Sequence, residues 1–124
     1  MKALTLAVVQ FTPELGEKEK NFFRMRELIE DVTADIIVFP ELCTTGYFFH
    51  SRDEVAKAAE PVAGRSGEFF RDMARDKNAV VVAGFAERHQ KNFYNACLVV
   101  VPEEKNPYVY RKTHLFYKEN ACFD

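Results

Sequence analysis

Cysteine and histidine are scarce in this sequence and are not spaced as metal ligands or disulfide partners. The 124 residues include three of each: Cys43, Cys97 and Cys122, and His50, His89 and His114. There is no C-x-x-C pair and no pair of histidines four residues apart, which argues against a zinc ribbon or a helical metal site. An odd number of cysteines also argues against a disulfide framework. We therefore expect free thiols in the cytoplasm and no cofactor.

An excess of one charge and a long apolar run are also missing. The chain has 17 basic and 19 acidic residues, a net charge of −2 and a pI near 5.9, so nothing points to nucleic acid or to an anionic membrane. No apolar run is long enough to span a membrane, and residues 1–9 do not form a signal peptide. The single glycine cluster, residues 64–67, lacks both G-x-G-x-x-G and a P-loop lysine, which leaves a nucleotide-binding domain poorly supported. With 48% hydrophobic residues, residues 1–124 are predicted to form one soluble globular unit with no internal domain boundary.

Hydrophobic periodicity predicts an α/β fold. A strand at residues 3–9, an amphipathic helix at 17–33 and a buried strand at 35–39 form a βαβ unit with parallel strands. Ser51 and Glu54 have the spacing of a capping box, which predicts a short helix to about residue 60, and Ser66 is the expected N-cap of a second amphipathic helix. Strands at 79–85, 93–101 and 108–112 are joined by links too short for helices and should be antiparallel. The predicted sheet is therefore mixed.

A carboxylate follows the buried strand at residues 35–39. Pro40 cannot donate to a sheet ladder and keeps Phe39 extended, so the chain delivers Glu41 just beyond the strand. Ligands of open α/β sheets bind at the carboxyl ends of strands. Position alone leaves two alternatives for Glu41, a functional carboxylate or a stabilising ion pair.

Two further charged residues have similar alternatives. Lys112 closes the strand at 108–112, where most lysines are solvated edge charges, and Glu119 lies in a loop. The ordered set of motifs around the three residues resembles the nitrilase superfamily of carbon–nitrogen hydrolases over essentially the whole chain. The motifs are Phe39-Pro40-Glu41-Leu42 with Thr45-Gly46-Tyr47, then Tyr94-Asn95-Ala96, then Tyr110-Arg111-Lys112-Thr113-His114-Leu115-Phe116 with Glu119.

The resemblance implies a fold and a chemistry. It implies an αββα sandwich, of which this chain would be about the N-terminal half, and hydrolysis of non-peptide carbon–nitrogen bonds by a glutamate, a lysine and a cysteine. Glu41 would be the general base, Lys112 the oxyanion stabiliser and Glu119 the second carboxylate. The substrates implied are small amides, nitriles or N-carbamoyl compounds.

The chain departs from the family at the nucleophile, because the family's cysteine lies farther downstream than Asp124. None of the three cysteines matches it, and Cys97 is expected in the core. We therefore expect the 124-residue chain alone to be inactive. It should associate with the missing C-terminal half or with another copy, as a homodimer or higher oligomer, through a sheet face rich in Val80, Val82, Leu98 and Val100 or their alternates.

Two other expectations complete the sequence interpretation. Asn95 is expected to be structural, satisfying a neighbouring backbone group rather than touching substrate. The alternative function is a non-catalytic binding or assembly module that retains the Glu41, Lys112 and Glu119 cluster to fix the geometry of the sheet.

Overall fold

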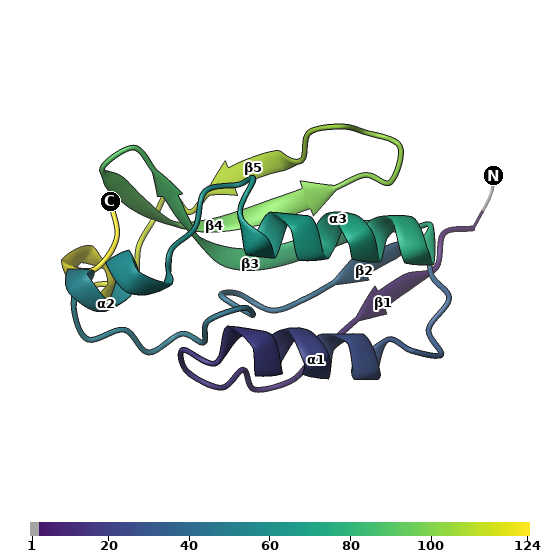
Figure 1. Ribbon diagram of the computed structural model, residues 1–124, viewed down its shortest axis with the longest axis horizontal. Coiled ribbons are helices and arrows are strands. Elements are labelled where there is room, and N and C mark those ends of the chain that lie inside the picture. The colour runs from purple at the N-terminus through teal and green to yellow at the C-terminus, as the bar shows by residue number, and fades with distance from the viewer. Residues whose placement is uncertain (1–2) are drawn as a thin grey trace.

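A five-stranded mixed sheet is the centre of the computed structural model, which describes residues 3–124 (Figure 1). Its strands are β1 (Leu6–Val8), β2 (Ile36–Val38), β3 (Val80–His89), β4 (Asn92–Val100) and β5 (Tyr108–Arg111), in that spatial order. The pairs β1–β2 and β2–β3 are parallel, whereas β3–β4 and β4–β5 are antiparallel. The predicted α/β class and the switch from parallel to antiparallel pairing are confirmed.

Helices cover one face of this sheet. Helix α1 (Lys18–Leu28) and helix α3 (Arg65–Lys77) lie side by side on it (Figure 1), and the Phe22 ring stacks on Phe69 with 4.2 Å between centroids. Their apolar faces bury Ile37, Val81 and Leu98 of the central strands. The short helix α2 (Arg52–Ala58) packs near the end of β3, and a single 3-10 turn, η1 (Glu119–Ala121), lies near the C-terminus. No helix within residues 3–124 is long and apolar enough to cross a membrane.

The opposite face of the sheet is largely uncovered. Leu6, Val8, Tyr108 and Tyr110 are each more than half exposed on it, while the strand positions between them are partly buried. Those positions are Val38, Val80, Val82, Cys97 and Val99. The sequence interpretation left open Leu98 and Val100 or their alternates for this face. The alternates Cys97 and Val99 lie here, because strand alternation turns Leu98 and Val100 toward α1 and α3. We call this surface the open face.

Two predicted helix ends were also wrong. Helix α1 ends at Leu28 rather than near residue 33, and the acidic residues Glu30 and Asp31 that follow oppose the negative C-terminal end of the helix dipole. The N-cap of α3 is Gly64 rather than Ser66. The Glu60 carboxylate satisfies this helix start instead, accepting hydrogen bonds from the Ser66 N–H and hydroxyl. At α2 the predicted cap is present, since Ser51 accepts from the Glu54 N–H at 3.3 Å.

The turn that carries Glu41 lies directly against the backbone of β3. The Gly84 N–H donates to the Pro40 carbonyl at 3.2 Å, and the Cys43 N–H donates to the Gly84 carbonyl at 3.0 Å. A Cβ atom at Gly84 would come within 2.6 Å of the Glu41 Cα and 2.5 Å of the Leu42 nitrogen. Leu42 is fully buried with a φ of 48°, a conformation that is strained for a bulky residue. Glycine at position 84 is therefore what allows this turn to sit on the sheet.

We predict that Gly84→Ala will destabilise the protein by about 1–3 kcal/mol, because the added methyl group meets rigid backbone rather than a side chain that can move. Denaturant unfolding followed by circular dichroism measures this change. Gly16→Ala is the control, since its Cβ would meet nothing within 4 Å and would test only the cost of a positive φ. Wild-type stability for Gly84→Ala would contradict the close approach.

Candidate active site

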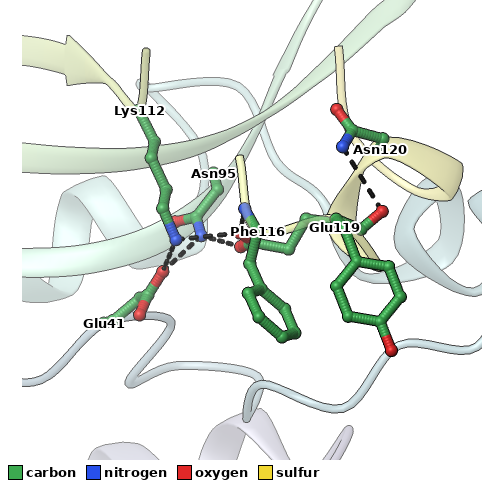
Figure 2. Close-up of polar contacts among 7 residues, drawn as sticks. Glu41, Asn95, Lys112, Phe116, Glu119 and Asn120 are labelled. Atoms are coloured by element: carbon green, nitrogen blue, oxygen red, sulfur yellow. Dashed lines mark hydrogen bonds and ion pairs between the residues drawn. The ribbon is translucent and has the colours of Figure 1, made fainter. Parts of the chain in front are cut away.

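The three charged residues singled out from the sequence meet at one end of the sheet. The Lys112 ammonium lies 2.8 Å from Glu41 Oε1 and 2.8 Å from Glu119 Oε2, so a single cation bridges two carboxylates. Figure 2 shows the Lys112 side chain directed at the Glu41 carboxylate. Glu41 and Lys112 are 71 residues apart in the chain, and only the folded sheet brings them together.

Each of these side chains is placed by a different element. Glu41 follows β2, Lys112 follows β5 and Glu119 opens η1. The Lys112 N–H donates to the Asn95 carbonyl at 2.8 Å, which continues the β4–β5 ladder by one residue and fixes where the lysine side chain starts. Glu119 is 6% exposed, and its Oε2 also accepts from the Phe116 N–H at 2.6 Å. The cluster is therefore held by both main-chain and side-chain contacts.

Asn95 belongs to the same cluster, contrary to the expectation from the sequence. Its side-chain nitrogen donates to Glu41 Oε1 and to Glu119 Oε1, each at 2.6 Å, and the residue is 4% exposed (Figure 2). Its partners are carboxylates rather than a neighbouring backbone group. The sequence did contain a signal for this placement, because alternation along β4 separates Asn95 from the apolar positions Ala96 and Leu98.

A partly exposed arginine and a buried glutamate form an ion pair that anchors the strand before Lys112. Arg111 donates to both oxygens of Glu87, at 2.7 and 2.8 Å, and the Glu87 side chain is 2% exposed. The Arg111 guanidinium also lies 4.0 Å from the centre of the Tyr94 ring. A bidentate pair of this kind fixes geometry as well as charge. Because Arg111 points to the helix-covered face, Lys112 is turned to the open face.

Burial and charge act in opposite directions on the ionisable groups of the cluster. Burial alone would lower the pKa of Lys112, but the hydrogen bonds and charges of Glu119 and Glu41 outweigh it and raise that pKa above its ordinary value. Burial would likewise raise the pKa of Glu119, but hydrogen bonds from Lys112, the Phe116 N–H and Asn95 keep that pKa below its ordinary value. The lysine and this glutamate therefore both remain charged at neutral pH.

A hollow of about 270 Å³ opens on this cluster. Its lining includes Glu41, Asn95, Lys112, Tyr110 and Cys97. Cys97 was expected in the core, but it is only partly buried and faces this hollow. A larger hollow of about 610 Å³ is lined mainly by the exposed charged residues around α1, away from the cluster. The smaller one approaches the volume of small-molecule sites and has polar groups that converge on it.

An aromatic hollow adjoins the cluster on the other side of Glu119. It measures about 190 Å³ and is lined by Tyr47, Phe48, Phe49, His50, Phe116, Lys118, Glu119, Cys122 and Phe123. The pKa of Tyr47 is raised by burial and then by the negative charges of Glu119 and Glu41, so its hydroxyl stays protonated at neutral pH. The sequence interpretation missed this hollow, because it is formed by two loops that have no periodic pattern.

The three thiols of the chain do not have the lowered pKa of an activated nucleophile. Burial raises the pKa of Cys43, of Cys97 and of Cys122, which favours the unreactive thiol over the thiolate. His114 is exposed. No group of three histidine, cysteine or acidic side chains within residues 3–124 is arranged to hold a metal ion. The arrangement can supply a base and a fixed positive charge to a reaction, but these three thiols are poorly suited to attack.

Comparison with known proteins identifies the family. The family model described as Carbon-nitrogen hydrolase matches residues 5–123. The chain is 38% identical over 125 residues to a nitrilase of Pyrococcus abyssi, covering 96% of this chain and 47% of the relative. It is 34% identical over 122 residues to an (R)-stereoselective amidase of a Pseudomonas species, covering 97% and 43%. It thus spans less than half the length of these two relatives.

Solved structures agree with this result. A crystal structure of an N-terminal amidase with a Gln-Gly peptide superposes with a TM-score of 0.89 at 28% identity, covering 96% of this chain and 30% of the amidase chain. The mixed sheet with its helices is therefore the fold of the nitrilase-like enzymes. By its sequence and its fold, the chain belongs to the carbon–nitrogen hydrolase family.

Proposed function

We propose that the protein to which these 124 residues belong hydrolyses small amides, nitriles or N-carbamoyl compounds. The observation that carries the proposal is the Lys112 ammonium, held 2.8 Å from each of two carboxylates beside a hollow that a small substrate could enter. Relatives named as a nitrilase and as an (R)-stereoselective amidase support nitriles and amides as substrates.

Glu41 is the proposed general base. A thiol attacks a carbonyl or nitrile carbon as the thiolate, so a base must remove its proton within hydrogen-bond reach. The Glu41 side chain is 46% exposed and lines the hollow, so a reacting group can approach it. Glu41 would then give this proton to the departing nitrogen, so that the amine or ammonia leaves and the carboxylate is regenerated. The same carboxylate would next take a proton from the water that attacks the acyl-enzyme.

Lys112 is the proposed oxyanion stabiliser, and Glu119 holds it in place. Attack on a carbonyl carbon puts negative charge on the oxygen, and a fixed donor aimed at that oxygen lowers the barrier. The raised pKa of Lys112 keeps the ammonium charged for this purpose. Glu119 is nearly buried and anchored by the Phe116 N–H, so it can fix the lysine without moving itself.

The nucleophilic thiol is proposed to come from outside these 124 residues. Burial disfavours the thiolate of all three cysteines present, so the chain alone should not turn over an amide. The open face suits a second sheet, since flat apolar sheet faces pack on one another about 10 Å apart. We propose that the rest of the hydrolase domain or a second copy covers it. The three free thiols suit a cytoplasmic protein.

The test is an assay of the protein expressed from the complete gene against a panel of amides, nitriles and N-carbamoyl compounds, with mass spectrometry for an acyl adduct on cysteine. We expect thiol-dependent hydrolysis. Lys112→Met should lower kcat/KM by about 100- to 1,000-fold, because the oxyanion loses its charged donor. Lys105→Met, which removes an exposed lysine in the β4–β5 turn, is the matched control.

Two results would contradict the proposal. One is that the protein from the complete gene hydrolyses none of the compounds and forms no acyl adduct on cysteine. This result would favour the non-catalytic binding or assembly module. The other is full activity in Lys112→Met. Thiol-dependent turnover by the 124-residue chain alone would instead overturn the assignment of the nucleophile to residues outside it.

The lowered pKa of Glu119 predicts acid sensitivity. Its carboxylate contributes stability that is fully present above the unfolded value near 4.5 and is lost as the pH falls through the lower folded-state pKa. Glu119→Gln should reduce the melting temperature at neutral pH and flatten its fall between about pH 6 and pH 3. Glu103→Gln, an exposed glutamate, is the control. An equal acid dependence in Glu119→Gln and wild type would refute this account.

The open face predicts association of the 124-residue chain. Sedimentation velocity should show a dimer or larger species, because an apolar surface of this extent is costly to leave in water. Leu6→Lys with Tyr108→Lys should shift the chain toward monomer. Phe23→Lys changes an equally exposed aromatic residue on α1, outside the open face, and should leave association unchanged. A stable monomer in the unmodified chain would argue against the proposed partner surface.

A further inference from the structure

Glu41 uses only one of its two carboxylate oxygens in the cluster. Oε1 accepts from the Lys112 ammonium at 2.8 Å and from the Asn95 amide at 2.6 Å. Within residues 3–124 no hydrogen bond reaches Oε2. A carboxylate has about four acceptor sites, so Oε2 keeps its full capacity to accept a proton, and the side chain is exposed enough to meet a reacting group.

We propose that Asn95 is a positioning residue, which ties Glu41 Oε1 and Glu119 Oε1 together and so leaves Glu41 Oε2 as the oxygen that takes the thiol proton. The inference rests on the proposed hydrolase function. It adds Asn95 to the cluster of Glu41, Lys112 and Glu119, and it states which of the two Glu41 carboxylate oxygens takes the proton.

The chemistry of the side chain supports this role. Carboxylates only accept hydrogen bonds, so the Asn95 nitrogen, with its two hydrogens, must face both glutamates. Serine would offer one hydrogen, and a second lysine would compete with Lys112 for the same oxygens. Asparagine is neutral and offers two donors, so it can join the carboxylates without altering the charge of the site.

Without Asn95, only Lys112 would restrain the Glu41 carboxylate. The carboxylate could then rotate to present both oxygens to the ammonium, and Oε2 would no longer be free. The main-chain bond from the Lys112 N–H to the Asn95 carbonyl does not depend on the side chain at position 95. A substitution there therefore tests the amide donors while the β4–β5 ladder remains.

The experiment uses the protein from the complete gene with Asn95→Ser, and with Asn92→Ala as the control. Asn92 lies in the same strand but is exposed and donates only to the Tyr94 hydroxyl. We expect Asn95→Ser to lower kcat by about 10- to 100-fold, because the base is misplaced, with KM changed by less than about threefold. A kcat equal to that of Asn92→Ala would overturn the inference.

Asn95→Asp is a second variant of nearly the same shape, for the case in which Asn95→Ser does not fold. Its ionised side chain would face Glu41 in the turn after β2 and Glu119 of η1. The Lys112 ammonium, just after β5, bonds both of these carboxylates, and the phenol of Tyr47 lies near enough to feel their charge. A third carboxylate repels the other two, whereas its protonated form can donate one hydrogen bond. Activity relative to wild type should therefore recover as the pH falls. A loss independent of pH would indicate a purely structural role.

A double-mutant cycle on stability separates this inference from the proposed function. Denaturation midpoints are compared for Asn95→Ser, Glu41→Gln and the double variant. We expect non-additive shifts, because the two side chains are hydrogen-bonded, whereas Asn92→Ala with Glu41→Gln should be additive. If the wild type hydrolyses nothing, the proposed function fails and the cycle still decides whether Asn95 restrains Glu41. An additive Asn95 cycle would overturn the restraint.

Discussion

A lysine ammonium between two carboxylates is the interaction around which this end of the molecule is arranged. One cation at 2.8 Å from two anions leaves the cluster with a net negative charge. Buried members of such a group need further hydrogen bonds beside the ion pair. Asn95 and the Phe116 N–H supply them to Glu119. Asn95 also donates to Glu41 Oε1, whereas Oε2 of the half-exposed Glu41 stays free of hydrogen bonds within residues 3–124. The cluster is therefore a preorganised set of charges rather than an incidental surface ion pair.

The sheet explains how residues far apart in the chain reach this point. β2 runs parallel to β3, β4 runs antiparallel to β3, and β5 runs antiparallel to β4. β2, β3 and β5 therefore run in one direction and β4 in the other. The carboxyl end of β2, the start of β4 and the end of β5 consequently lie at the same end of the sheet. Gly84 allows the Glu41 turn to lie against β3, and the Arg111–Glu87 pair fixes β5 just before Lys112. The site depends on backbone placement as much as on its charged residues.

Much of this architecture could be predicted from the sequence because its signals are local. Apolar periodicity predicted the strands, the helices and the mixed pairing of the sheet, and the family resemblance predicted that Glu41, Lys112 and Glu119 would converge. The errors arose where a distant partner determines the outcome. Ser66 lost its capping role to Glu60, whose side chain reaches the helix start from within the loop that leads into α3, and Asn95 binds two carboxylates that only folding brings near. The sequence left open whether Leu98 and Val100 or their alternates lie on the open face, because the register could not be fixed before the pairing of β3 with β4 was known.

The protonation state of Lys112 tests the central claim most directly. In protein with isotope-labelled lysine, the side-chain resonances of Lys112 can be followed by NMR as the pH is raised, with Lys112→Met used for assignment. Two flanking carboxylates require the ammonium to lose its proton only above the ordinary lysine value of 10.5. Titration at or below that value would mean that the carboxylates do not hold the cation, and would contradict the account of the site.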